Sequence, residues 1–164
     1  NFVLPPGRSS VFRGIKNTIL IDSTYNANLD PMKVILDLFN RIRSKGEKWV
    51  VLGDMLEQGK NEEREHKLLA NEIIKINFDR VILMGPRVSK YTQPLLSCNV
   101  ESFLGPKEVL DYLKLNISGS ETILFKGARF LEGVIENLLE NRVDAAKLPR
   151  REKVWEIRRR KWGL

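Results

Sequence analysis

The sequence is poor in cysteine and histidine, and it has no long apolar run. Cys98 is the only cysteine among 164 residues, so no disulfide can form within the chain, and a reducing, cytoplasmic location is the default expectation. His66 is the only histidine, which argues against a zinc site of the usual type. No apolar stretch approaches the ~20 residues of a membrane-spanning helix. We therefore expect a cytoplasmic domain that holds no metal of its own and does not enter a membrane.

The common phosphate-binding loops are also missing. Neither G-x-x-x-x-G-K-[ST] nor G-x-G-x-x-G occurs in the sequence, so we do not expect the chain to hydrolyse ATP by itself. The chain begins with Asn1 rather than Met, and its first residues do not have the pattern of a signal peptide. We expect a fragment of a longer protein whose remainder carries part of the chemistry.

Positive charge is concentrated at the C-terminal end. Of the formal net charge of +7, residues 147–164 carry +6, from eight Lys and Arg residues and two Glu residues, which leaves +1 for the other 146 residues. A nearly neutral body argues against nucleic acid as the partner of the fold. We expect a basic helical tail over 147–164, whose Trp155 and Trp162 dock on the body while its cations face solvent. Contact of this basic tail with RNA, an acidic partner or a membrane surface is the alternative.

Short apolar segments alternate with segments of helical periodicity. The apolar segments predict buried strands at 18–21, 49–52, 80–84, 100–104 and 122–125. The periodic segments predict helices that begin near 31 and 106 and helices that span 61–76 and 128–141. This alternation predicts an α/β fold with a parallel sheet and helices on both faces. Residues 10–13 are expected to pair with the first strand through a turn at 14–17.

Polar side chains gather where three of the predicted strands end. The segment 22–28 (DSTYNAN) follows the first strand, and 53–59 (GDMLEQG) follows the second. The segment 126–129 (KGAR) follows the last strand and opens a helix, where free N–H groups and two cations favour an anion. Because ligands bind beyond the carboxyl ends of parallel strands, these loops predict a cleft for a polar or anionic ligand. Helix capping for 22–28 and a flexible loop for 53–59 remain alternatives.

Four segments, in order, resemble the C-terminal domain of the Mur ligases. They are Gly7-Arg8, 22–28, 51–59 with His66, and 126–129. The resemblance covers about residues 7–141 and is strongest to the Mur ligases that add D-alanyl-D-alanine to a UDP-muramoyl-tripeptide in peptidoglycan synthesis. It implies a Rossmann-like domain over 9–146, preceded by an interdomain linker at 1–8 and followed by the basic tail.

The resemblance also implies a three-domain, ATP-dependent ligase of which this chain is one part. An N-terminal domain would hold the UDP-muramoyl-tripeptide, and a central domain would carry ATP and Mg²⁺, so this chain would be inactive alone. ATP would phosphorylate the terminal carboxylate of the tripeptide, and the amine of D-alanyl-D-alanine would attack the acyl phosphate once the domains close. The two other domains are thus the implied partners.

Catalytic and nucleotide contacts follow from the resemblance residue by residue. Arg8 corresponds to an Arg at the domain junction that approaches the nucleotide phosphates, where its planar fork suits phosphate oxygens. Asp22 and Ser23 correspond to an Asp-Asp pair, one of which contacts the ribose. His66 belongs, with Asp54 and Glu57, to the loop and helix that frame the incoming amine.

Substrate contacts are implied for the remaining polar residues. Tyr25, Asn26 and Asn28 would face the dipeptide and the nucleotide, while Lys126 and Arg129 would hold the dipeptide carboxylate. Ser23 stands where the family has a second Asp, and Ala128 stands where it has Ser. These departures leave open a Mur-type ligase for a different amino acid. A basic-tailed module that binds RNA or an acidic partner is the remaining alternative.

Overall fold

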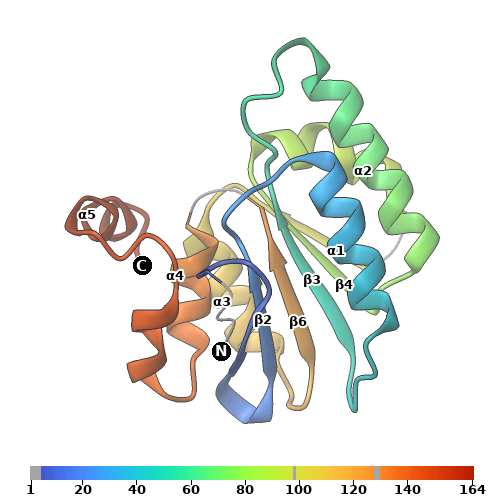
Figure 1. Ribbon diagram of the computed structural model, residues 1–164. Coiled ribbons are helices and arrows are strands. Elements are labelled where there is room, and N and C mark those ends of the chain that lie inside the picture. The colour runs from blue at the N-terminus through green and yellow to red at the C-terminus, as the bar shows by residue number, and fades with distance from the viewer. Residues whose placement is uncertain (1–4, 98, 128–129) are drawn as a thin grey trace.

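The computed structural model describes residues 5–97, 99–127 and 130–164, which form a six-stranded sheet between layers of helices (Figure 1). The strands are β1 (Ser10–Arg13), β2 (Ile19–Ser23), β3 (Lys48–Gly53), β4 (Arg80–Met84), β5 (Val100–Phe103) and β6 (Thr122–Lys126). Their spatial order is β1-β2-β6-β3-β4-β5. β1 is antiparallel to β2, and the other neighbouring strands are parallel. The predicted α/β fold, its mostly parallel sheet and its N-terminal hairpin are confirmed.

Helices cover both faces of the sheet. The longer ones are α1 (Leu29–Arg41), α2 (Glu62–Ile76), α3 (Pro106–Asn116), α4 (Leu131–Leu138) and α5 (Lys153–Lys161). Figure 1 shows α1 and α2 on one face of the sheet and α3 and α4 on the other. The helix bounds differ most from the prediction in α1, which begins at Leu29 rather than at Pro31, and in α4, which spans Leu131–Leu138 rather than 128–141. None of the helices in the described residues has the length and apolar character needed to cross a bilayer.

The apolar core lies in two layers because the central strands are buried on both sides. Val51 and Phe125 belong to the layer that includes α3 and α4, whereas Val50 and Leu124 belong to the layer that includes α1 and α2. Since neighbouring strand residues point to opposite faces, a strand between two helical layers needs an unbroken apolar run. This requirement explains why the strand positions could be found from the sequence.

The strand order places three loops at one edge of the sheet. β6 is the last strand in the chain but lies between β2 and β3. The helices that follow β2 and β3 lie on one face, and the helix that follows β6 lies on the other (Figure 1). Open parallel sheets bind ligands where connections diverge to opposite faces in this way. The loops after β2, β3 and β6 therefore flank the expected position of a ligand.

The basic tail (residues 147–164) packs beside α4, on the side of the molecule away from α1 and α2 (Figure 1). The rings of Trp155 and Trp162 lie 6.4 and 5.9 Å from the ring of Phe130, as expected for a docked helix. Some cations of the basic tail are buried, however, and do not face solvent. Arg159 is buried, and Arg150 forms an ion pair with the fully buried Glu132. The tail is thus joined to the body by buried charge as well as by aromatic packing.

Candidate functional site

Two adjoining hollows lie at the carboxyl edge of the sheet. The first, which we call the edge cleft, has a volume of about 350 Å³. Its walls come from the loops after β2, β3 and β6 and from the basic tail. They are formed by Tyr25, Asn26, Ala27, Asn28, Leu56, Glu57, Gly127 and Arg150. The structure therefore brings together residues from all three loops that the sequence singled out.

The second hollow, which we call the linker hollow, has a volume of about 610 Å³ and lies between the N-terminal linker and α1. Arg8, Ser23 and Lys126 supply polar groups, and α1 supplies apolar side chains and the Asp30 carboxylate. Tyr25 and Asn26 line both hollows, so the two spaces meet at this pair. The Arg8 guanidinium carbon lies 5.0 Å from the centre of the Tyr25 ring, which is cation–π distance.

Hydrogen bonds fix the loop over residues 24–28, which we call the polar loop. The Asp22 Oδ1 atom accepts bonds from the Thr24 backbone N–H at 3.0 Å and from its Oγ1 hydroxyl at 2.7 Å. The Asn26 side chain accepts a bond from the Ala27 N–H at 2.8 Å. At the far end, Gln58 Nε2 donates to Asn28 Oδ1 at 3.1 Å, which joins the polar loop to the loop after β3.

Asp22 does not face either hollow. Its side chain is 0% exposed, and its Oδ2 atom has no hydrogen-bond partner among the described residues. Burial raises the pKa of this carboxyl, although bonds from Thr24 and the charge of Arg150 act in the opposite direction. Within this domain Asp22 holds the polar loop, and its nucleotide contact stays a prediction of the resemblance. Ser23 is the member of the pair that lines the linker hollow.

His66 and Asp54 are also committed to internal contacts. His66 is 0% exposed; its Nε2 atom accepts a bond from the Met55 N–H at 3.2 Å, and its Nδ1 atom lies 2.7 Å from the Glu62 carbonyl oxygen. Asp54 Oδ1 accepts bonds from the N–H groups of Arg87 at 3.0 Å and Val88 at 2.9 Å. Both residues therefore shape the loop after β3. Both ring nitrogens of His66 are engaged within the chain, and its catalytic role stays a prediction of the resemblance.

Lys126 is a buried cation at the end of β6. Its side chain lines the linker hollow together with Arg8, not the edge cleft. Burial lowers the pKa of Lys126 to about 8, while the charge of Asp22 opposes the shift. A cation that loses hydration without a close carboxylate partner favours an incoming anion. Arg129, its expected companion, and Ala128 lie outside the described residues.

We predict that the Lys126 amine titrates near pH 8, which can be measured by NMR on ¹³Cε-labelled lysine with Lys126→Met to assign the resonance. Because the folded pKa lies below the ordinary value of 10.5, the unfolded chain binds more protons between pH 8 and 10.5. The free energy of unfolding should therefore rise with pH across this window. Inorganic phosphate bound in the linker hollow should raise the pKa again. Titration at the ordinary lysine value would contradict this burial.

No group of three His, Cys, Asp or Glu side chains within the described parts of the chain is arranged to hold a metal ion. Acidic side chains at the edge of the sheet are separated by their contacts. Asp22 bonds to Thr24, and Asp54 pairs with Arg87, whose Nη1 atom lies 3.3 Å from its Oδ2 atom. Glu57 is exposed on the wall of the edge cleft. Of these three carboxylates, Glu57 is the one that lines the edge cleft.

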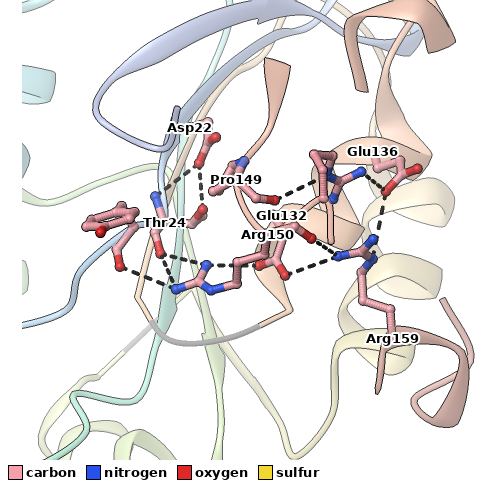
Figure 2. Close-up of polar contacts among 9 residues, drawn as sticks. Asp22, Thr24, Glu132, Glu136, Pro149, Arg150 and Arg159 are labelled. Atoms are coloured by element: carbon pink, nitrogen blue, oxygen red, sulfur yellow. Dashed lines mark hydrogen bonds and ion pairs between the residues drawn. The ribbon is translucent and has the colours of Figure 1, made fainter. Parts of the chain in front are cut away.

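Arg150 is the site residue that sequence reasoning missed. It belongs to the basic tail, yet it reaches the edge cleft and contacts the polar loop (Figure 2). The sequence shows it only as one of several tail cations. Its contact with Thr24 spans 126 positions, so no local pattern could have identified it.

Comparison with known proteins places the chain in a family. Residues 7–129 match the family described as Mur ligase, glutamate ligase domain. The chain belongs to this family. The predicted resemblance is thereby confirmed, and it covers all three loops around the edge cleft of this Mur ligase domain.

Its curated relatives include several UDP-N-acetylmuramoyl-tripeptide–D-alanyl-D-alanine ligases. Those of Buchnera aphidicola (subspecies Acyrthosiphon pisum) and Bacillus subtilis are each 33% identical to it over 128 residues; the matches cover 76% and 74% of this chain and 27% and 28% of the relatives. The Escherichia coli enzyme is 30% identical over 145 residues, covering 86% of this chain and 31% of the relative. This Mur ligase domain thus spans less than a third of the length of these relatives.

Solved structures agree with the fold. MurF from Acinetobacter baumannii is 26% identical with a TM-score of 0.70, covering 83% of this chain and 31% of that one. The MurF ligase of Thermotoga maritima, solved in complex with ADP, is 22% identical with a TM-score of 0.66, covering 96% and 33% of the two chains. Because the Thermotoga maritima structure is only 22% identical, its similarity supports the fold and nothing further.

Proposed function

We propose that this domain is the C-terminal substrate domain of an ATP-dependent ligase that adds D-alanyl-D-alanine to a UDP-muramoyl-tripeptide. The observation that carries the proposal is the meeting of three loops of the family at the edge cleft, where polar side chains line a space of about 350 Å³. The curated relatives are named for the same reaction. Substrates, cofactors and the remaining domains belong to the proposal because the match spans only part of each relative.

The edge cleft suits the incoming dipeptide. A dipeptide offers an amine, an amide and a carboxylate, and the cleft offers a Glu57 carboxylate, amide groups of Asn26 and Asn28, and the nearby charge of Arg150. The exposed Glu57 can accept a hydrogen bond from the amine. Because Glu57 lines the edge cleft and His66 is buried, we propose Glu57 as the residue that contacts the incoming amine.

The linker hollow suits phosphate oxygens. Arg8 and Lys126 place two cations around it, and Ser23 adds a hydroxyl group. The Asp30 carboxylate also lines the hollow, but its side chain is 94% exposed to solvent. The donor set therefore fits ATP, which supplies the phosphoryl group that activates the tripeptide carboxylate when it is bound on the central domain. Arg8 would bind the phosphates of ATP. Lys126 would also contact these phosphates, rather than the dipeptide carboxylate, because it lines the same hollow. We expect Mg²⁺ to be held on the central domain.

Orientation is the contribution of this domain to the reaction. Tyr25 and Asn26 separate the space proposed for the amine from the space proposed for the phosphate groups. Closure against the central domain would thus bring the amine and the activated carboxylate together across this pair. Holding two reactants in one geometry supplies much of the rate in such reactions.

We expect the full-length enzyme to release phosphate from ATP when UDP-muramoyl-tripeptide and D-alanyl-D-alanine are both present. L-Alanyl-L-alanine and single amino acids are the matched alternatives, because Ser23 and Ala128 depart from the family pattern. Faster turnover with one of these would replace the proposed nucleophile, and no release with any of them would contradict the ligase function. An amide NMR titration of this chain with the same dipeptides should shift Tyr25, Asn26 and Asn28 if the edge cleft alone suffices for binding.

A further inference from the structure

Arg150 joins the basic tail to the polar loop. Its Nη1 and Nη2 atoms donate to the Thr24 carbonyl oxygen at 3.3 and 3.4 Å, and Nη2 also donates to the Tyr25 carbonyl oxygen at 3.3 Å. Figure 2 shows the guanidinium between these carbonyl groups on one side and Glu132 on the other. The Arg150 side chain thus contacts the backbone of the polar loop at Thr24 and at Tyr25, and Tyr25 lines the edge cleft.

Buried charged residues on α4 and α5 hold Arg150 in place. Its Nη1 atom lies 3.3 Å from Glu132 Oε2, and Glu132 on α4 is 0% exposed. The buried Arg159 of α5 donates to the Arg150 carbonyl oxygen at 2.8 Å and lies 3.7 Å from Glu132 Oε1. Arg150 itself has a φ of +58°, an uncommon conformation for a residue other than glycine. Both its backbone and its side chain are therefore held by α4 and α5.

Thr24 is consequently held from two sides. Asp22 bonds to its N–H and hydroxyl groups, and Arg150 bonds to its carbonyl oxygen (Figure 2). The next two residues, Tyr25 and Asn26, line both hollows. A shift of the Thr24 carbonyl group would move these two side chains and change the shape of the cleft.

We propose that Arg150 is a positioning residue for the incoming amine substrate, and that the basic tail serves to hold it against the polar loop. The inference rests on the proposed function, whose cleft it completes. The tail lies outside residues 7–129, the part of the chain that the family model matches. An arginine suits the position because its planar group can donate to two carbonyl oxygens and a carboxylate at once.

The test uses the full-length enzyme with Arg150→Ala and Arg150→Lys. We expect Arg150→Ala to raise KM for the amine substrate about tenfold while kcat and the KM for UDP-muramoyl-tripeptide stay within about twofold. The KM for ATP should rise less than that for the amine, because Tyr25 and Asn26 also line the linker hollow. Arg150→Lys should recover part of the loss, because an ammonium group cannot reach all three acceptors. Added guanidinium ion should rescue Arg150→Ala but not the wild type. Arg160→Ala is the matched control, since Arg160 is an exposed tail cation that pairs with Glu156.

The outcomes separate this inference from the proposed function. If the wild type uses a nucleophile other than D-alanyl-D-alanine, the proposed substrate is wrong, and the same KM comparison is made with that nucleophile. If Arg150→Ala and Arg150→Lys match Arg160→Ala in this KM, the inference is overturned. It is equally overturned if both Arg150 variants lower kcat and raise every KM together with a lower melting temperature, because that pattern describes a purely structural residue.

Discussion

Replacing Gly127 with alanine is expected to lower the free energy of unfolding by about 3 kcal/mol or more. Gly127 has a φ of +138°, a region that L side chains rarely adopt. A Cβ atom there would lie 2.3 Å from the Gly53 nitrogen and 2.5 Å from its Cα atom. Because these are backbone atoms at the ends of β6 and β3, relief of the clash requires the two strands to separate. Urea unfolding followed by circular dichroism measures the loss.

Gly59 offers the matched control for this substitution. It also has a positive φ, +54°, but nothing lies within 4 Å of the position that its Cβ atom would occupy. Gly59→Ala should therefore cost only about 1 kcal/mol, from conformation alone. Equal losses for the two variants would show that the close approach of β3 and β6 does not limit stability. A larger loss at Gly127 would show that the close approach of the ends of β3 and β6 contributes to stability.

The layers of the fold could be predicted because they follow from local patterns. Apolar runs such as residues 49–52 must be strands covered on both faces, and residues 106–116 begin with Pro and continue with helical spacing. The sequence predicts that α1 begins near Pro31, although Asn28 also suits the cap of a helix. The structure begins α1 at Leu29 and places Pro31 in the first turn, where its missing N–H group has no cost.

The loops that form the site could be predicted, but the direction in which their side chains point could not. Loops at the carboxyl ends of parallel strands share one edge whatever the strand order. Whether Lys126 joins the edge cleft or the linker hollow depends on β6 lying beside β2, which no local pattern encodes. In the same way, Asp54 is occupied by the N–H groups of Arg87 and Val88, more than thirty positions away. A carboxylate with buried partners of this kind has a structural role, and only the three-dimensional structure distinguishes it from a carboxylate that is free to bind a ligand.

Glu132→Ala is expected to lower the free energy of unfolding by about 3–5 kcal/mol, the range found when one partner of a buried ion pair is removed. Glu132 is 0% exposed and lies within ion-pair distance of Arg150 and Arg159, and Arg159 is itself only 6% exposed. Removing the carboxylate leaves the buried Arg159 guanidinium with one ion-pair contact among the described residues, at 3.9 Å to the partly exposed Glu136. Thermal and urea unfolding of this chain measure the change.

Glu136→Ala separates the buried pair from the general effect of charge on the tail. Glu136 also contacts two tail cations, Arg151 at 2.7 Å and Arg159 at 3.9 Å, but its side chain is 36% exposed. Water can replace its contacts, so its loss should cost about 1 kcal/mol or less. If Glu132→Ala proved no more damaging than Glu136→Ala, the buried pair would contribute little to stability. A raised KM for the amine substrate in Glu132→Ala would then identify the placement of Arg150 against the polar loop as the main consequence of burying this charge.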